Sequence, residues 1–406
     1  MKSILTVSFY ADFSRFFNNV EAKLDSEVKM LNLCLCPSAF IYSKTHKQSA
    51  IFLPSSIGSF RGFEKWSVEV SQEDLQRICS YHINPEAYFN TANLYLAYFN
   101  YFLDKNNFDL IILSGDSRIA VKALDYIAKK LKIKTIYFEQ GPYGTTILDY
   151  DGVNANCSFR HKINVSDDPT AKKKALSRKV KKWSGHKKYR IFDYVFDFFK
   201  LTRLELRDTK VSFLKRASPA GDSYPLPEKF ILLVLQVPED ANMRCHSPFF
   251  NCHYDIVKSL YDNLPLGLSL VVREHPLYKG GYEKEMYEFI RENNILLSDG
   301  HGLEKSIKQS ELVVVNNSTV GIESLLLGKT VLVLGDSYYD NPNFIYKYTG
   351  SNLKDHINKA LSNPLDFKLV EKRLNYMFEK NFISGHFREL ENDFNDVAKV
   401  VDGYLL

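Results

Sequence analysis

Two polar clusters in the second half of the chain have the residue types and the spacing to hold a phosphate group. Each follows an apolar run that is typical of a strand, and the second cluster opens a predicted helix over residues 320–327. The clusters comprise Arg273, His275 and Pro276, and then Asn317, Ser318 and Thr319. Backbone amides at a helix start have no intrahelical partners and carry partial positive charge, so anions bind there. Because open α/β sheets bind ligands beyond the carboxyl ends of their strands, the pattern predicts a nucleotide-phosphate site.

Several of these residues also have a structural explanation. Ser318 is expected to cap the helix whether or not a phosphate binds, and His275 could bond to a loop carbonyl. Glu323, inside the same helix, could accept ribose hydroxyls or remain solvated.

Carboxylates follow predicted strands in both halves of the chain and could act directly on a sugar. Glycosyl transfer with retention needs one carboxylate that attacks the anomeric carbon and a second group that handles the acceptor proton. Asp240 and Glu139 are the candidate pair. Asp240 could instead cap the helix that follows it, and Glu139 could bind backbone amides of its own turn. The other polar strand-end residues are Gln236 in the second half and Asp116, Arg118, Gln140, Gly141 and Tyr143 in the first half.

The elements that position these residues alternate between strand and helix, which predicts an α/β protein with two Rossmann-like domains facing across a cleft. A chain of 406 residues exceeds the size at which single cores stop growing. We expect an N-terminal, acceptor-binding domain over 1–222, with a basic helical insert at about 166–215, and a nucleotide-sugar domain over 223–365. Helices over 366–406 are expected to pack back toward the N-terminal domain. The predicted strands are 4–9, 29–36, 110–113, 135–139, 230–236, 269–273, 296–297, 312–315 and 330–334.

Missing motifs narrow the function further. The first predicted strand is not followed by GxGxxG, and no GxxxxGK[ST] occurs, so the dinucleotide and P-loop fingerprints are absent. The six cysteines have no framework spacing and Met1 leads directly into a strand, which predicts reduced thiols in a cytoplasmic protein. Cys245–His246 and Cys252–His253 match no known zinc spacing, so we expect no metal. No uninterrupted apolar run is long enough to span a membrane.

A basic segment suggests where the protein acts. Residues 171–190 hold ten Lys or Arg and no acid, and an amphipathic, aromatic stretch follows to about residue 206. This pattern is typical of a solvated face or of contact with an anionic membrane, and the aromatic sequel favours the membrane for 171–207. Nucleic acid is disfavoured because basic and aromatic residues are not interleaved on a strand platform.

The order of these motifs resembles the bacterial capsule polysaccharide biosynthesis family, which includes β-Kdo glycosyltransferases of capsule and O-antigen assembly. The likeness covers roughly 109–340. The matching segments are 114–118, 138–141, 151–154, 235–236 with Asp240, 246–249, 273–276, 317–329, 334–336 and 338–340.

The resemblance implies a GT-B fold, a CMP-Kdo donor, and transfer to a glycan or glycolipid at the inner face of the bacterial inner membrane. It assigns the cytidylate phosphate to His275 and Ser318, a nucleophilic role in retaining double displacement to Asp240, and acceptor deprotonation to Glu139. The segment 142–146 departs from the Arg-Pro that often follows the glutamate turn, and we expect it to face the acceptor. Because cationic side chains and helix amides can neutralise the departing CMP, no divalent cation or other cofactor is expected.

Two alternatives stay open from the sequence. An inverting transferase of the CMP-sialic-acid type would use Asp240 or Glu139 as a base and form no covalent sugar adduct. A noncatalytic factor for capsule assembly or export would bind nucleotide or glycan without transferring it.

Overall fold

A computed structural model describes residues 2–177, 187–198, 225–238, 240–276, 278–298, 300–363, 365–390 and 394–406. The chain divides into two compact units. Unit 1 combines Met1–Val153, Thr170–Arg207 and Phe378–Leu406, and unit 2 combines Asn154–Pro169 with Asp208–Met377. The predicted boundary between 222 and 223 lies outside the described residues, as do residues 178–186 and 199–224 of the basic segment and its sequel.

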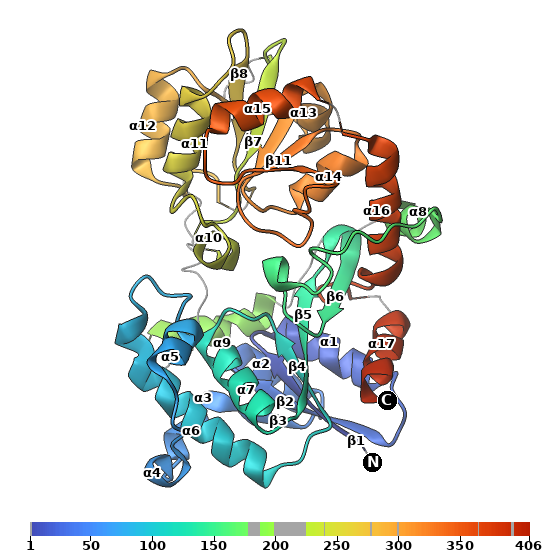
Figure 1. Ribbon diagram of the computed structural model, residues 1–406. Coiled ribbons are helices and arrows are strands. Elements are labelled where there is room, and N and C mark those ends of the chain that lie inside the picture. The colour runs from blue at the N-terminus through green and yellow to red at the C-terminus, as the bar shows by residue number, and fades with distance from the viewer. Residues whose placement is uncertain are drawn as a thin grey trace. The chain divides into compact units, whose positions relative to one another are not determined.

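Unit 1 is built on a seven-stranded sheet with the order β13-β6-β5-β4-β1-β2-β3 (Figure 1). The five strands β1 to β5 are parallel, whereas β6 pairs antiparallel with β5 and β13 pairs antiparallel with β6. The strands are β1 (Lys2–Ser8), β2 (Val28–Cys34), β3 (Ala50–Phe52), β4 (Leu110–Ser114), β5 (Lys134–Gln140), β6 (Thr145–Asp149) and β13 (Ile383–Ser384).

Helices cover both faces of this sheet, as the sequence of its central strand requires. Along β4, Ile111 and Leu113 point into one buried cluster and Leu110 and Ile112 into another, so both faces exclude water. The first cluster includes α6 and α7, and the second includes α1 and α17. The helices are α1 (Ala11–Glu21), α2 (Pro37–Thr45), α3 (Leu53–Ser59), α4 (Phe63–Trp66), α5 (Gln72–Ile78), η1 (Pro85–Tyr88), α6 (Phe89–Lys105), α7 (Ile119–Lys130), η2 (Pro142–Gly144), α8 (Thr170–Ser177), α9 (Lys187–Phe198) and α17 (Asn395–Leu405).

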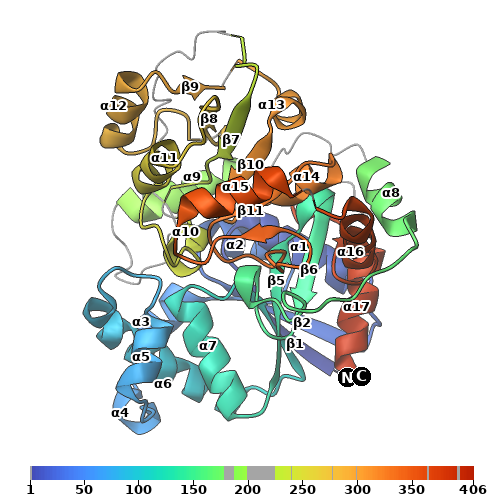
Figure 2. The ribbon, with the colours of Figure 1, turned by 45° about the horizontal axis from the view of Figure 1, so that its top comes forward.

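The two ends of the chain meet in unit 1. Lys2 Nζ donates to the carbonyl of Leu405 at 2.6 Å, and the two termini lie side by side in Figure 2. The last helix, α17, therefore packs beside the first strand and contacts α1.

Unit 2 is built on a six-stranded, wholly parallel sheet with the order β12-β11-β10-β7-β8-β9. Its strands are β7 (Phe230–Val234), β8 (Ser269–Arg273), β9 (Leu296–Leu297), β10 (Leu312–Val315), β11 (Val331–Val333) and β12 (Tyr346–Lys347). Its helices are η3 (Asn154–Asn156), α10 (Ala241–Cys245), α11 (His253–Asp262), α12 (Lys284–Glu292), α13 (Leu303–Gln309), α14 (Val320–Leu326) and α15 (Leu353–Ser362), and α16 (Phe367–Lys380) passes from unit 2 into unit 1. The predicted α/β class with two Rossmann-like sheets is confirmed.

The strand orders fix where each sheet can bind a ligand. In both sheets the chain first builds outward on one side of the first strand and then returns to build on the other side. The direction changes between β1 and β4 in unit 1 and between β7 and β10 in unit 2. Loops on either side of such a switch point diverge and leave a crevice at the carboxyl edge, where doubly wound sheets bind ligands.

Residues 154–169 belong to unit 2, although the predicted boundary assigns them to the N-terminal domain. Arg160 makes a bidentate contact with Asp340, with Nε 2.8 Å from Oδ1 and Nη2 2.6 Å from Oδ2. Arg373 on α16 donates to the carbonyls of Phe159 and Asn164 at 2.8 and 3.0 Å. These long-range contacts hold the segment on unit 2, and hydrophobic periodicity carries no signal for them.

Candidate functional site

At the switch point of unit 2, the first residue of interest is Gln236, which lies just beyond β7. Its side chain is only 6% exposed, yet neither Oε1 nor Nε2 has a hydrogen-bond partner among the described residues. Buried polar groups are nearly always paired, so an unpaired amide at a sheet edge indicates a missing ligand or water. The backbone of Gln236 is fixed, because its carbonyl accepts the hydroxyl of Tyr282 at 3.0 Å.

Asn317 occupies the matching position beyond β10. Its Nδ2 donates to the carbonyls of Asn242 and His246 at 3.0 and 2.9 Å, which orients the amide. Its Oδ1 is buried and has no partner in the described part of the chain. The strands β7 and β10 are neighbours, so the unpaired atoms of Gln236 and Asn317 follow adjacent strands at the same sheet edge.

Ser318 and Thr319 lead into α14, as predicted. Thr319 is the N-cap residue, and its side chain makes no capping hydrogen bond. Ser318 was expected to be the N-cap residue and instead lies one position before it, but its Oγ still accepts the first amide of the helix, that of Val320, at 3.3 Å. The hydroxyl of Tyr339 donates to the carbonyl of Ser318, and Gly321 is required beside it because a Cβ there would overlap the Tyr339 ring. With seven residues, α14 is short, so its dipole adds modestly to anion binding.

Arg273 and His275 supply less positive charge than their types suggest. Arg273 Nη1 donates to the carbonyls of Ser298 and His301 at 3.1 and 2.7 Å, so part of the guanidinium secures the loop beyond β9. Burial lowers the pKa of His275, which favours a neutral imidazole at pH 7. A neutral ring can still exchange hydrogen bonds with a phosphate, but it does not neutralise one. Pro276 is exposed.

Tyr282 is a positioning residue that the sequence did not indicate. Its hydroxyl accepts the backbone amide of His275 at 2.9 Å and donates to the carbonyl of Gln236. One phenol therefore joins the loops that follow β7 and β8. Glu274 supports the same loop, because its carboxylate accepts the amide of Gly280 at 2.9 Å and the hydroxyl of Tyr287.

Two carboxylates of unit 2 that the sequence singled out, Glu323 and Asp240, are both half-buried. Glu323 is half-buried, burial raises its pKa, and its carboxylate has no hydrogen bond or ion pair among the described residues. Asp240 is half-buried at the N-cap of α10, but its side chain makes no capping hydrogen bond. The capping alternative for Asp240 therefore finds no support in the geometry. A nearby contact is Asn242 Nδ2, 3.5 Å from Asp240 Oδ2.

In unit 1 the predicted residues gather at the carboxyl edge of the sheet, mostly in local contacts. Glu139 Oε1 accepts the amide of Gln140 at 2.8 Å, which is the turn contact considered as its structural alternative. Asp116 Oδ2 accepts the amide of Val153 at 3.0 Å. Arg118 is buried, and its guanidinium carbon lies 3.7 Å from the centre of the Tyr81 ring.

The turn after Glu139 has a tight, irregular backbone. Gly141 donates to the carbonyl of Thr145 at 2.9 Å, and a Cβ at Gly141 would overlap the Thr145 hydroxyl. Tyr143 adopts a left-handed conformation with φ of 51°, which is uncommon for a residue other than glycine. Its ring lies 6.4 Å from that of Phe378.

Three arginines lie at this edge, and the sequence indicated only one of them, Arg118, as a site residue. The guanidinium carbon of Arg190 lies 3.6 Å from the centre of the Tyr10 ring. Burial raises the pKa of Tyr10 to about 12, against the opposing charges of Arg190 and Arg118. Burial lowers the pKa of Arg388, which interacts electrostatically with Glu139, Arg190 and Tyr10. The edge of unit 1 therefore brings three arginines toward one tyrosine, with carboxylates beside two of them: Arg190 Nε lies 3.2 Å from Asp193 Oδ2, and Arg388 interacts electrostatically with Asp12 as well as with Glu139.

Neither a membrane span nor a metal site is found in the described part of the chain. None of its helices is both long and apolar enough to cross a bilayer. No group of three or more His, Cys, Asp or Glu side chains within the described ranges could hold a metal ion.

Comparison with known proteins decides the family. The family model described as "Capsule polysaccharide biosynthesis protein" matches residues 109–388. The chain belongs to this family. The resemblance drawn from the motifs is thereby confirmed, and it places the protein in capsule polysaccharide biosynthesis.

Individual relatives are more distant. Protein FixF of Sinorhizobium fredii (strain NBRC 101917 / NGR234) is 31% identical over 167 residues, which cover 39% of this chain and 40% of FixF. The chain thus aligns with less than half the length of that relative. The capsule polysaccharide export protein KpsS of Escherichia coli is 24% identical over 297 residues, which cover 64% of this chain and 76% of KpsS.

Solved structures with a similar chain course include two from Thermosulfurimonas dismutans KpsC. The β-Kdo 2,7 transferase aligns with 100% of this chain and 98% of that chain, with 13% identity and a TM-score of 0.42. The β-Kdo 2,4 transferase aligns with 66% of this chain and 87% of that chain, with 15% identity and a TM-score of 0.39.

Proposed function

We propose that the protein is a glycosyltransferase that moves Kdo, an acidic octulosonate sugar, from CMP-Kdo to a glycan or glycolipid in bacterial surface polysaccharide synthesis. The observation that carries the proposal is a set of buried side-chain atoms without hydrogen-bond partners among the described residues at the unit 2 switch point, namely Oε1 and Nε2 of Gln236 and Oδ1 of Asn317. Membership of the capsule polysaccharide biosynthesis family supports the substrate class. The donor is proposed to lie against Gln236 and Asn317, with its phosphate near Ser318 and His275, and with the ribose hydroxyls accepted by Glu323.

The proposed chemistry is retaining. The Asp240 carboxylate attacks the anomeric carbon of Kdo, the bond from that carbon to the phosphate oxygen breaks, and CMP leaves with the electron pair. The acceptor hydroxyl then gives its proton to Glu139 and displaces Asp240 from the anomeric carbon. Support for Asp240 comes from its half-buried carboxylate, which makes no capping hydrogen bond. Arg273 would hold the loop beyond β9 through the carbonyls of Ser298 and His301, and the rest of its guanidinium would face the donor phosphate.

The acceptor is proposed to bind at the carboxyl edge of unit 1. Arg118, Arg190 and Arg388 suit an acceptor that carries a carboxylate or a phosphate. Asp116, Gln140, Gly141 and Tyr143 surround the same edge at the ends of β4 and β5 and would shape the entry of the sugar.

We also propose that the protein attaches peripherally to the anionic inner face of the inner membrane. On α9, Ile191, Phe192 and Val195 are 60%, 47% and 48% exposed, which gives the helix an uncovered apolar stripe. Lys172 in α8 is buried, so it is unavailable to lipid headgroups. A Phe192→Ser substitution should reduce co-sedimentation with phosphatidylglycerol vesicles, and Ile163→Ser, at a more exposed apolar residue of unit 2, should not. Undiminished sedimentation of the Phe192→Ser protein would contradict the attachment.

Mass spectrometry tests the transferase proposal. Incubation of the protein with CMP-Kdo should release CMP and add the mass of one Kdo residue to the protein, and an acceptor glycan should remove that adduct. Asp240→Ala should abolish the adduct but keep CMP binding, whereas Asp262→Ala, an exposed carboxylate on α11, should behave like the wild type. Transfer without any adduct, with inverted product configuration, would indicate the inverting mechanism. Failure to consume CMP-Kdo or CMP-sialic acid with any acceptor would indicate a noncatalytic factor.

A further inference from the structure

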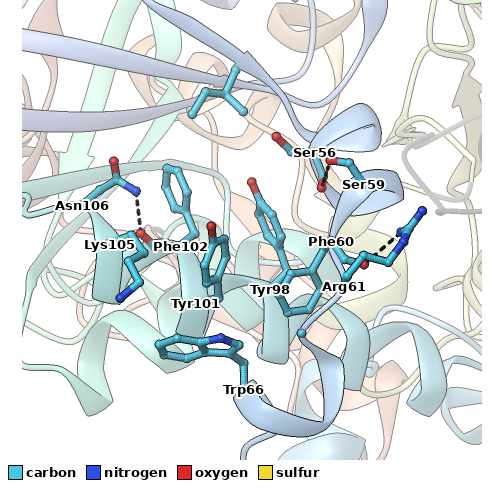
Figure 3. Close-up of a pocket in the computed structure, with 12 residues that line it drawn as sticks. Ser56, Ser59, Phe60, Arg61, Trp66, Tyr98, Tyr101, Phe102, Lys105 and Asn106 are labelled. Atoms are coloured by element: carbon cyan, nitrogen blue, oxygen red, sulfur yellow. Dashed lines mark hydrogen bonds between the residues drawn. The ribbon is translucent and has the colours of Figure 1, made fainter.

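Unit 1 contains a cavity that none of the residues discussed so far lines. Its volume is about 470 Å³, and it lies between the α3–α4 segment and the second half of α6 (Figure 3). This volume falls within the range of sites that hold small organic ligands. The cavity is therefore distinct from the candidate sites at the carboxyl edges of the two sheets.

Five of the twelve residues that line the cavity are aromatic. Tyr98, Tyr101 and Phe102 project from one face of α6, because residues three and four apart share a helix face. Phe60 and Trp66 contribute rings from the α3–α4 side, each with its centroid 5.5 Å from that of Tyr101. Rings that only sealed the core would be covered, but Tyr101 is 37% exposed. The wall thus offers open ring surface to a ligand at Tyr101.

Unused hydrogen-bonding groups stand among these rings. The indole N–H of Trp66 and the hydroxyl of Tyr101 have no hydrogen-bond partner within the described residues. Arg61 donates only through Nη1, to the carbonyls of Gly58 and Phe60 at 2.8 and 3.1 Å, so Nε and Nη2 remain for a ligand. The cavity therefore pairs flat apolar surfaces with donors at their margins.

The charges near the cavity are mainly positive. Figure 3 shows Arg61 at one end and Lys105 at the other, with the rings between them. Lys105 Nζ lies 5.5 Å from the centre of the Trp66 ring and 3.0 Å from Asp104 Oδ2, so its charge is shared with one acid. A ligand that spans the cavity would meet a cation at each end, which favours negative groups there.

We propose that this cavity binds an acidic oligosaccharide, as an accessory site that holds a glycan chain away from the transfer site. A sugar ring presents a flat C–H face that packs on aromatic rings, hydroxyls that accept the N–H and O–H donors, and carboxylates that pair with Arg61 and Lys105. The proposal goes beyond the transferase function, because it depends on none of the residues at either sheet edge. A membrane-inserting surface would instead present its rings outward, whereas Tyr98 and Phe102 are buried in the cavity wall.

Gly62 allows the Trp66 ring to take its place in the wall. A Cβ at Gly62 would lie 2.8 Å from Trp66 Cδ1 and 3.2 Å from Phe60 Cε2, so an added methyl group must displace a ring. A Gly62→Ala substitution therefore disturbs the wall without removing any group that would touch the ligand.

Trp66 also provides the assay, because the chain contains only two tryptophans. With Trp183→Phe as background, fluorescence of the full-length protein reports on Trp66 alone. Titration with hexagalacturonate or with a sialic acid hexamer should give a saturable change for at least one of them, and maltohexaose should bind at least about tenfold more weakly. Tyr101→Ala and Arg61→Ala should each lower the affinity for the acidic hexamer by at least about tenfold, or about 1.4 kcal/mol. Gly62→Ala should also weaken it, and Lys23→Ala, an exposed lysine of the same unit, should not.

Three results would overturn the accessory site. The first is no saturable response to either acidic hexamer, and the second is an affinity for maltohexaose equal to that for the acidic hexamers. The third is a fluorescence response to phosphatidylglycerol vesicles but to no oligosaccharide, which would identify this surface as a membrane contact. The outcome is independent of the transfer chemistry, because Asp240→Ala should leave the Trp66 response unchanged even if the protein transfers no sugar.

Discussion

Replacing Gln236 by methionine should stabilise unit 2 and at the same time weaken nucleotide binding. The side chain is 6% exposed, and its Oε1 and Nε2 have no partner among the described residues. A buried polar group without a partner costs about 1–3 kcal/mol, and methionine has nearly the same length without that cost. We therefore expect the Gln236→Met protein to gain about 1–3 kcal/mol in the free energy of unfolding of unit 2.

The same substitution removes the hydrogen bonds that Gln236 is proposed to make with the donor. Each neutral hydrogen bond is worth about 0.5–1.5 kcal/mol, so losing those of Oε1 and Nε2 together costs about 1–3 kcal/mol, or about 5- to 150-fold in CMP affinity. Residues that reduce stability while serving a ligand are expected at functional sites.

Two measurements on the full chain check this prediction. Hydrogen exchange of the amides in β7 and β10 reports the stability of unit 2 by itself, which avoids treating two units as one transition. Calorimetric titration with CMP gives the affinity. Gln309→Met, an exposed glutamine at the end of α13, is the matched control and should change neither quantity. A Gln236→Met protein with a less stable unit 2 and unchanged CMP affinity would refute the argument, because Gln236 would then be a structural residue.

Three further predictions concern single side chains of unit 2. Burial lowers the pKa of His275 from its ordinary value of 6.5. Below about pH 6.5 the unfolded chain therefore binds a proton that the folded chain resists, and the free energy of unfolding falls. In the His275→Asn protein, the free energy of unfolding should depend less on pH in this range. Burial raises the pKa of Glu323 above 4.5, so the folded state favours its neutral form; Glu323→Gln should stabilise unit 2 at pH 7, and the gain should vanish as the pH falls below about 4. Arg160→Ala removes one partner of the buried Asp340 and should lower the free energy of unfolding of unit 2. The loss should lie near the lower end of about 3–5 kcal/mol, because Lys347 remains 3.2 Å from the Asp340 carboxylate. Hydrogen exchange in unit 2 measures this loss, and Arg291→Ala, at an exposed arginine, is the control.

The sequence predicted the sheets well because their central strands are buried on both faces. Runs such as Leu312–Val315 are wholly apolar, and such runs are typical of parallel strands between two layers of helices. The antiparallel additions, β6 and β13, were not predicted. The second of these has two residues and is defined by its pairing with Thr145 and Thr146, more than two hundred positions earlier. Such long-range pairing leaves no local pattern.

The candidate site was predicted in position more accurately than in chemistry. The sequence placed Gln236 and Asn317 just beyond two predicted strands, and the structure shows that these strands, β7 and β10, are neighbours in the sheet. The side-chain roles depend on contacts that spacing does not reveal. The Arg273 guanidinium donates hydrogen bonds to two backbone carbonyls, and burial lowers the pKa of His275, which favours the neutral imidazole.

The arginine group of unit 1 could not have been found by reading along the chain. Tyr10, Arg118, Arg190 and Arg388 come from segments separated by more than a hundred residues in most cases. They interact only because α9 and the segment before α17 return to the first sheet. The role of Tyr282 was also hidden from the sequence, because its hydroxyl joins the loops that follow two strands adjacent in space.

A crystal structure with CMP bound tests the central claim most directly. The account predicts the nucleotide at the carboxyl edge of unit 2, with hydrogen bonds from its polar atoms to the side-chain amide of Gln236 and to Asn317, and with its phosphate beside Ser318. Nucleotide bound at the edge of unit 1, or the Gln236 amide still unpaired with CMP bound elsewhere, would contradict it.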